Sequence, residues 1–237
     1  MRRIGTALAL SALVMATLAS GVSAAKPLNG PPPSPGHGAH GKVKPIKGFA
    51  PPGAGTHGHS MLDLATAFTV WTFGTGEGGP TLEARCEQSA IDKKVWFLPV
   101  SIGDDLPVTC NVPHGAWLLV SPGGSECSNL EDEPWYGADN NDLGACVEET
   151  FEDLTYAELT LDGRTASESQ LQPYILTTRT VNLPADNLLS SEPGISRFKA
   201  YFLLVKPLSR GTHTMLAYDE FDDGDFVGEV SYTINVR

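Results

Sequence analysis

Apolar and polar residues alternate along most of the chain after residue 60, a pattern typical of half-buried β-strands. Two short apolar runs, at 95–98 and 116–120, are each followed closely by glycine or proline and predict further strands. Phe68, Val70 and Phe73 mark an apolar segment near the start. The other predicted strands are 156–161, 174–181, 198–205, 212–218 and 227–236.

Turn signals separate the later strands. Asp162-Gly163 is a two-residue hairpin signal that leads into a weaker partner strand. Pro207 and Gly211 interrupt the strand pattern in the link 206–211. We expect this link to turn the chain between two antiparallel strands.

One segment has helical spacing instead. Asp142 fits a helix N-cap, and apolar residues recur after it every three or four positions. They are Leu143, Cys146, Val147, Thr150, Phe151 and Leu154. Many short strands with one helix favour a mainly β fold, an antiparallel two-sheet sandwich (jelly-roll or immunoglobulin-like) with one short helix packed on a sheet.

The first 60 residues follow a different pattern. Basic residues at the start, an apolar stretch and small residues ending at Ala24 have the layout of a cleavable signal peptide over residues 1–24. Residues 25–60 are rich in Pro, Gly, Lys and His and are predicted to be a flexible linker. We expect one secreted domain over 61–237, with no membrane span after cleavage.

The predicted domain is strongly acidic. Six of the 16 basic residues precede Met61 and all 28 acidic residues follow it, so residues 61–237 carry a formal charge of −18. This charge repels phosphate backbones and anionic lipid headgroups, so nucleic acid and membrane surfaces are not expected as partners. Cations and neutral ligands such as glycans stay compatible with it.

Four cysteines lie in the domain: Cys86, Cys110, Cys127 and Cys146. In the oxidising compartment that a signal peptide implies, four cysteines favour two disulfides, and three pairings are possible. Because sequence neighbours in a sandwich are usually spatial neighbours, Cys86–Cys110 and Cys127–Cys146 are the predicted pairs.

Several short motifs follow one another along the domain from about Cys86 onward. They are Val95-Trp96-Phe97-Leu98, Cys110 with Val112-Pro113-His114-Gly115, Glu126-Cys127-Ser128, Cys146 in a helix, Leu183-Pro184-Ala185-Asp186-Asn187, and Lys206-Pro207-Leu208-Ser209-Arg210-Gly211-Thr212-His213. Together they resemble a widespread family of uncharacterised secreted bacterial proteins. The resemblance implies a secreted β-sandwich-like domain and brings no activity with it. The chain departs from the family pattern at 99–105 and in the acidic stretch 219–225.

No strong catalytic motif occurs: HExxH, GxSxG and a phosphate-binding glycine loop are all missing. A Ser-His-Asp triad is recognised by its geometry and not by sequence order, so the sequence does not decide whether His114 or His213 belongs to one. The alternative is an ordinary structural role for these histidines. Acidic pairs would suit glycosidase chemistry, although in so acidic a domain such pairs discriminate little. Examples are Asp104 with Asp105 and Asp139 with Asp142. An enzyme is therefore not favoured, and no catalytic residue is assigned.

Trp135 and Tyr136 are the predicted ligand-binding residues. They lie in a polar loop where burial is not required, whereas Trp96 and Trp117 lie within apolar runs and are expected in the core. Stacking on a glycan is the hypothesis for the pair, and folding back onto the core is the alternative.

Two acidic loops give a second hypothesis, a calcium site. Asp219, Asp222, Asp223 and Asp225 crowd one expected hairpin turn, and Asp139 and Asp142 flank two asparagines beside the predicted helix. Like charges this close repel one another, and a bound cation would remove that cost. Hydration would also reduce the repulsion between the carboxylates at an exposed turn. The alternative is therefore that both loops are solvated acidic surface without a metal ion. No other cofactor is expected.

These features favour a secreted, non-catalytic binding or structural domain that contacts glycans or another extracellular protein. The alternative is a secreted hydrolase that uses carboxylates to cleave glycans. A buried pair of acids in one cleft, with pKa values shifted in opposite directions, would favour the hydrolase. Acids spread over the rim of a cleft would favour the binding domain.

Overall fold

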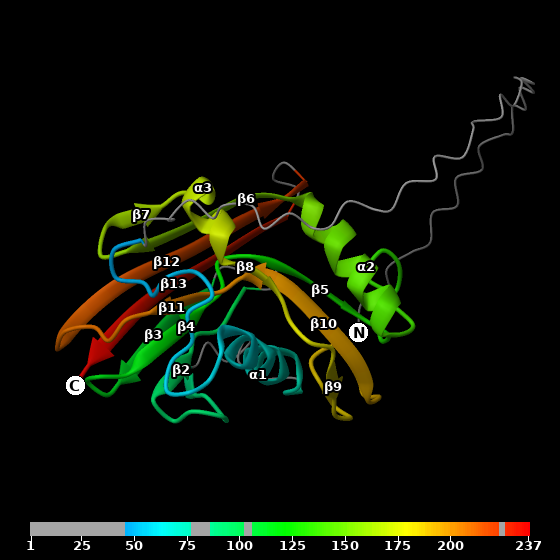
Figure 1. Ribbon diagram of the computed structural model, residues 1–237, viewed down its shortest axis with the longest axis horizontal. Coiled ribbons are helices and arrows are strands. Elements are labelled where there is room, and N and C mark those ends of the chain that lie inside the picture. Colours follow the sequence, from blue (N-terminus) through cyan, green and yellow to red (C-terminus); the bar gives the residue numbers. More distant parts are fainter. Residues whose placement is uncertain (1–45, 77–85, 102–105, 223–225) are drawn as a thin grey trace, which may run out of the picture. The chain divides into compact units, whose positions relative to one another are not determined.

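The structure is a computed structural model that describes residues 46–76, 86–101, 106–222 and 226–237. The predicted signal peptide at 1–24 and the linker segment 25–45 lie outside the described residues. The described part is mainly β, with antiparallel-rich sheets and short helices, which confirms the predicted fold class (Figure 1).

The described strands form three sheets. The first sheet has the order β1 (Glu87–Gln88), β2 (Val95–Phe97), β4 (Trp117–Val120), β11 (Leu203–Val205). The second has the order β5 (Gly124–Ser128), β10 (Gly194–Tyr201), β8 (Ile175–Thr177), with β9 (Val181–Leu183) also beside β10. The third has the order β3 (Leu106–Val112), β13 (Phe226–Val236), β12 (Gly211–Phe221), β6 (Leu154–Leu161), β7 (Arg164–Ala166).

Three α-helices occur among the described residues, where the sequence predicted one. They are α1 (Met61–Phe73), α2 (Asn140–Thr150) and α3 (Glu168–Leu171), with the 3₁₀ turns η1 (Phe151–Asp153) and η2 (Gln172–Tyr174).

Two predicted hairpins are confirmed in the third sheet. β12 and β13 pair along their whole length, with Gly211 opposite Val236 at one end. β6 turns into β7 through Asp162 and Gly163, which both take the positive φ that such a turn requires. The sheets are not wholly antiparallel, because β3 runs parallel to β13 and β2 runs parallel to β4.

The predicted strand 198–205 is divided between two sheets. β10 pairs with β5 in the second sheet, and β11, which begins after Phe202, pairs with β4 in the first. The link 206–211 then leads from the first sheet to β12 in the third. Both of its flanks are strands, as predicted, but β11 and β12 do not pair with one another.

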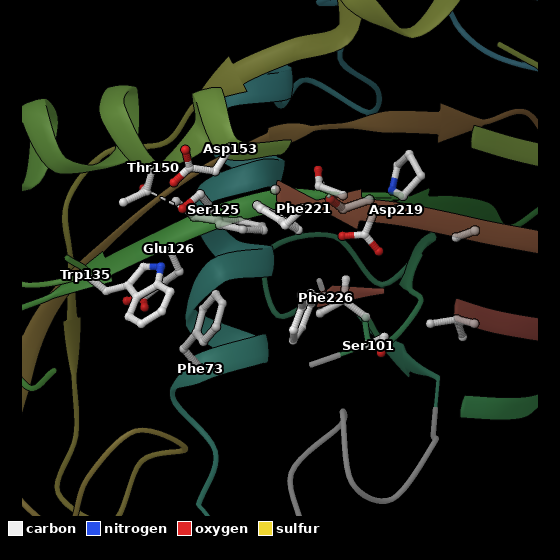
Figure 2. A pocket seen from close by; sticks show the side chains of 18 of the residues that line it. Phe73, Ser101, Ser125, Glu126, Trp135, Thr150, Asp153, Asp219, Phe221 and Phe226 are labelled. Carbon is white, nitrogen blue, oxygen red and sulfur yellow. Dashed lines mark hydrogen bonds between the residues drawn. The ribbon is translucent and has the colours of Figure 1, made fainter. Parts of the chain in front are cut away.

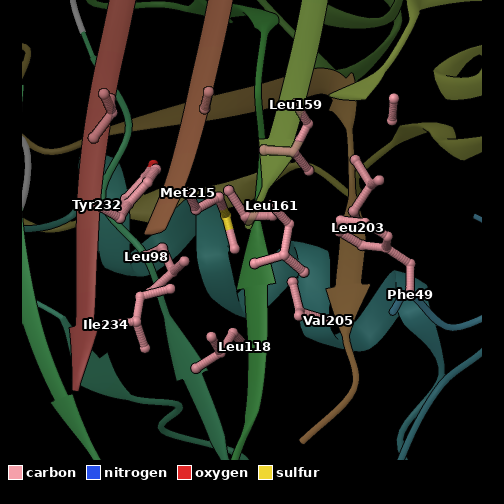
Figure 3. Packing of buried hydrophobic residues seen from close by; sticks show 14 of the residues in the cluster. Phe49, Leu98, Leu118, Leu159, Leu161, Leu203, Val205, Met215, Tyr232 and Ile234 are labelled. Carbon is pink, nitrogen blue, oxygen red and sulfur yellow. The ribbon is translucent and has the colours of Figure 1, made fainter. Parts of the chain in front are cut away.

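The first sheet is a middle layer with apolar residues on both faces. Leu118 and Leu203 pack against side chains of β6, β12 and β13 (Figure 3). Leu119 and Leu204 belong to a second apolar cluster that includes α1. A strand that is buried on both faces needs apolar residues at successive positions, which accounts for the uninterrupted apolar runs of the sequence.

α1 corrects the period-two interpretation of the segment around Phe68 and Val70. The backbone N–H of Asp63 donates to Ser60 Oγ, and the Asp63 carboxylate accepts from the Ser60 backbone N–H, both at 3.1 Å. This reciprocal capping starts the helix and competes successfully with a strand. Phe68 is fully buried, and its ring meets three other aromatic rings at centroid distances of 5.5 to 5.9 Å.

The folded domain begins before Met61, so the predicted linker boundary at residue 60 is wrong. Phe49 is 1% exposed and forms an isolated β-bridge with Val205. The Ala50 backbone N–H donates to the Leu204 carbonyl oxygen at 2.8 Å. A few apolar residues therefore fix a segment whose overall composition is that of a linker.

α2 is the predicted helix with a different start. Its N-cap is Asp139 and not Asp142, because Asp139 accepts hydrogen bonds from the backbone N–H groups of Asn141 at 2.7 Å and of Asp142 at 3.1 Å.

Both predicted disulfides are confirmed. Cys127–Cys146 ties β5 to α2, and Cys86–Cys110 ties the residue before β1 to β3. No cysteine is free. Within the described ranges, no helix has the length and apolar character that crossing a membrane requires.

Candidate functional site

A pocket of about 420 Å³ opens where the three sheets meet, and we call it the main pocket (Figure 2). The loop 121–123 between β4 and β5, strands β5, β10, β12 and β13, and the end of α1 contribute to its lining. The site therefore depends on segments from both halves of the domain.

Five aromatic side chains wall the main pocket. Phe73 and Phe198 meet edge to face with ring centroids 5.5 Å apart, and Phe221 and Phe226 do the same at 5.8 Å. Trp135 is 50% exposed at the rim. Trp135 and Phe73 lie at one end, and Phe221 and Phe226 lie between them and the far end (Figure 2).

Glu126 provides a buried carboxyl group beside Trp135 (Figure 2). Burial first, and then its hydrogen bond with Glu131 and the repulsion between the two carboxylates, raise the pKa of Glu126 well above its ordinary value. A hydrogen bond from the Ser196 hydroxyl opposes this rise. Glu131 in turn accepts a hydrogen bond from Ser128 Oγ at 3.2 Å. Burial and the neighbouring carboxylate of Glu131 therefore both favour the protonated form of Glu126.

Asp219 lies at the opposite end of the main pocket (Figure 2). A Cβ atom at Gly228 would lie 2.3 Å from Asp219 Oδ1, and one at Gly123 would lie 2.9 Å from Asp219 Cβ, so glycine at both positions gives the carboxyl group its room. Burial raises the pKa of Asp219 to about 7. None of the described residues donates a hydrogen bond to this carboxyl group.

The structure separates the predicted pair Trp135 and Tyr136. Both side chains are exposed, at 50% and 42%, so neither folds back fully onto the core. Trp135 lines the main pocket, whereas Tyr136 lines a second pocket that also contains Asp142 and Glu149. Of these two residues, only Trp135 can therefore stack on a ligand in the main pocket.

The residues of the two acidic loops are dispersed. Asp219 and Asp222 line the main pocket, and Asp223 and Asp225 lie outside the described residues, as do Asp104 and Asp105. Asp139 caps α2, and Asp142 lines the second pocket. The part of the chain that the structure describes contains no group of three or more His, Cys, Asp or Glu placed to hold a metal ion, and calcium binding stays a prediction.

His213 lies in a Ser-His-Asp arrangement of the kind that the sequence left open. Its Nδ1 is 2.7 Å from Asp162 Oδ2, and its Nε2 is 3.3 Å from Ser209 Oγ. Nε2 also lies 3.0 Å from the Ser209 carbonyl oxygen, which can only accept, so Nε2 carries a proton. A ring protonated there cannot take the serine proton, and none of the three residues lines either pocket. The arrangement fastens the link 206–211 to the β6–β7 turn.

The hydrogen-bonded ion pair of His213 and Asp162 is expected to make a pH-dependent contribution to the stability of the domain. The hydrogen bond to Asp162 raises the pKa of His213 above 6.5, helped by the Ser209 carbonyl and opposed by burial. Burial tends to raise the pKa of Asp162, but the hydrogen bonds from His213 and from the Thr214 backbone N–H, together with the nearby charges of His213 and Arg164, lower it below 3.8. The contribution is therefore complete from about pH 4 to 6.5, and it is lost as the pH rises through the raised pKa of His213.

We expect His213→Ala to lower the free energy of unfolding by about 1 kcal/mol at pH 6 and by clearly less at pH 9, since part of the pair is solvent-exposed. Urea denaturation at the two pH values measures the difference. His114→Ala, which changes an exposed histidine in a turn, serves as the control. An equal loss at both pH values would contradict the charged pair.

The main pocket contains residues that sequence reasoning missed. They are Phe73, Glu126, Glu131, Asp153, Phe198, Phe221 and Phe226. One signal was available on β12, where Ala217, Asp219 and Phe221 alternate with Tyr218 and Glu220 and therefore share a face. No local pattern joins these residues to Glu126.

No family model, no curated protein and no solved structure matches the chain. Its function is therefore inferred from the geometry of the main pocket.

Proposed function

We propose that the domain is a secreted, non-catalytic binding domain that takes a small ligand in the main pocket. The observation that carries this proposal is the combination of a pocket of about 420 Å³, aromatic walls and a few converging polar groups. Small-molecule sites are typically concave, mostly apolar and lined by a small number of polar side chains. The two disulfides fit the oxidising compartment that secretion provides.

The pKa shifts and the positions of Glu126 and Asp219 favour a binding domain over a hydrolase. The pKa values of Glu126 and Asp219 are both raised, and these residues lie at opposite ends of the main pocket (Figure 2). Hydrolysis by a carboxylate pair needs one acid that is protonated and a nearby one that is ionised. The criterion of opposite shifts is thus not met by these two groups.

One observation favours a glycan hydrolase as the second candidate, namely the contact between Glu126 and Glu131, which places two carboxyl groups next to Trp135. Release of reducing ends from soluble oligosaccharides tests it. Hydrolysis that is abolished by Glu126→Gln and kept by Glu152→Gln, a change outside both pockets, would make the hydrolase the better assignment.

Trp135→Ala tests the binding function. We expect thermal-shift and calorimetric screening of oligosaccharides and small amines to find a ligand whose Kd rises about tenfold in this variant, because the ring supplies a large apolar contact at the rim. Both proteins should have the same melting temperature without ligand, because half of the Trp135 surface is already exposed.

Tyr136→Ala is the matched control. It removes the neighbouring exposed aromatic ring, which lines the second pocket and not the main pocket. The expected change in Kd is less than twofold. An equal loss of affinity in both variants would place the ligand elsewhere on this loop.

A further inference from the structure

The aromatic walls of the main pocket are suited to a positively charged ligand. The faces of Trp and Phe rings carry partial negative charge and attract ammonium groups that come within about 6 Å of the ring. Five such rings line the main pocket, and Trp135 and Phe226 remain 50% and 41% exposed and so accessible from its mouth.

The polar groups of the main pocket have one sign of charge. Its acidic residues are Glu126, Glu131, Asp153, Asp219 and Asp222. Among the lining residues that the structure describes there is no Lys, Arg or His. Low-dielectric walls around carboxyl groups concentrate a negative potential, which raises the local concentration of cations.

Asp219 is a lining acid whose carboxyl group has no hydrogen-bond donor among the described residues. Its neighbours Gly123 and Gly228 offer no side chain to pair with it. Burial alone raises its pKa to about 7. A cation placed beside it would replace the lost solvation and restore the ionised form.

We propose that the main pocket binds a small organic cation, an amine or a quaternary ammonium compound, between its aromatic walls and its carboxyl groups. This inference rests on the proposed binding function and names the class of ligand. A neutral glycan would use the rings but would leave the carboxyl groups without a counter-charge.

Binding of a cation is coupled to release of a proton. Ser101 after β2 and Tyr232 on β13 lie near Asp219, and Asp222 lines the same pocket. Tyr232 donates its hydroxyl proton to the Pro99 carbonyl oxygen at 2.6 Å, and burial keeps it protonated. At the other end of the pocket, Glu126 also has a raised pKa, because of its burial and its contact with Glu131.

The test compares cations with neutral molecules of the same shape. Choline is paired with 3,3-dimethylbutan-1-ol, and 2-phenylethylammonium with 2-phenylethanol, by isothermal titration calorimetry of the full domain. We expect at least one cation to bind about tenfold or more tightly than its neutral partner. Its affinity should rise about tenfold from pH 6 to pH 8, because the ionised fraction of Asp219 rises in this range. Titrations in buffers of different ionisation enthalpy count the protons released.

Asp219→Asn should weaken cation binding about tenfold and remove most of its pH dependence. Glu220→Gln is the matched control, since it removes the same charge one residue away on the opposite face of β12, where Glu220 accepts a hydrogen bond from Tyr218. Phe226→Ala, at an exposed position, provides a second variant if Asp219→Asn alters the fold.

The outcomes separate this inference from the proposed function. Equal affinity for cation and neutral partner, or Trp135-dependent binding of neutral oligosaccharides alone, would overturn the cation inference and leave the binding function standing. Absence of binding for every amine, alcohol and oligosaccharide probe at millimolar concentration would overturn both. Equal losses in Asp219→Asn and Glu220→Gln would mean that only the overall charge of the domain attracts the cation.

Discussion

Phe49→Ala is expected to lower the free energy of unfolding by about 3–5 kcal/mol, although its segment has the composition of a flexible linker. Phe49 is 1% exposed and packs near Leu203 and Val205 at the edge of the first sheet (Figure 3). Truncation removes a ring from a packed interior and leaves a cavity that the middle layer cannot fill. The loss would show that the domain needs residues before Met61.

Urea denaturation followed by tryptophan fluorescence measures this effect. Lys47→Ala is the matched control, because Lys47 is exposed two residues away and its replacement should change the free energy by less than about 0.5 kcal/mol. A change below about 1 kcal/mol for Phe49→Ala would contradict the packing of this segment.

Asp219→Asn is expected to raise the free energy of unfolding at pH 8 by about 2 kcal/mol. The pKa of Asp219 is about 7 in the folded domain against 3.8 for a free aspartate, which corresponds to an upper limit of about 4 kcal/mol. The asparagine amide is also left unpaired, which offsets part of the gain.

The sign of the pH dependence follows from the raised pKa. Between about pH 4 and 7 the folded state holds a proton that the unfolded state has lost, so the stability of the wild-type domain falls as the pH rises through this range. The gain in the free energy of unfolding that Asp219→Asn produces should therefore be close to zero at pH 4 and constant above pH 8. Urea midpoints from pH 4 to 9 measure it, with Glu220→Gln as the control.

A gain in stability together with a loss of ligand affinity would identify Asp219 as a residue kept for binding at the expense of stability. A destabilising effect of Asp219→Asn at pH 8 would instead mean that the ionised carboxylate is stabilised in the folded state, against the raised pKa.

Local signals were sufficient for the hairpins. The alternation along β12 and β13 and the Asp162-Gly163 turn are properties of neighbouring residues, and the structure has both features where the sequence predicted them. The disulfide pairs followed from chain proximity in the same way. α1 was not predicted because the apolar residues around Phe68 fit both periods, and the Ser60–Asp63 capping box decides between them in favour of the helix.

The candidate site could be predicted only in fragments. The sequence predicts Trp135 as a ligand-binding residue because it lies in a polar loop where burial is not required, and in the structure it lines the main pocket. For Asp219 the sequence predicts a different role, as a calcium ligand on an exposed turn. Its strand position turns it inward with Phe221, while Asp222 follows at the exposed end of β12.

The sequence by itself predicted strands where the structure has β2, β4, β6, β12 and β13, and it favoured the observed cysteine pairs, because backbone periodicity and short loops are local properties of the chain. Only the tertiary structure decided that Leu118 and Leu119 face two different cores, that Phe49 is buried, and that Glu126 and Asp219 line one pocket. Alternation shows that a strand has two faces, but what covers each face depends on contacts between segments far apart in the chain. The pocket exists because three sheets meet around glycine and serine positions at 121–125, and no single segment encodes that meeting.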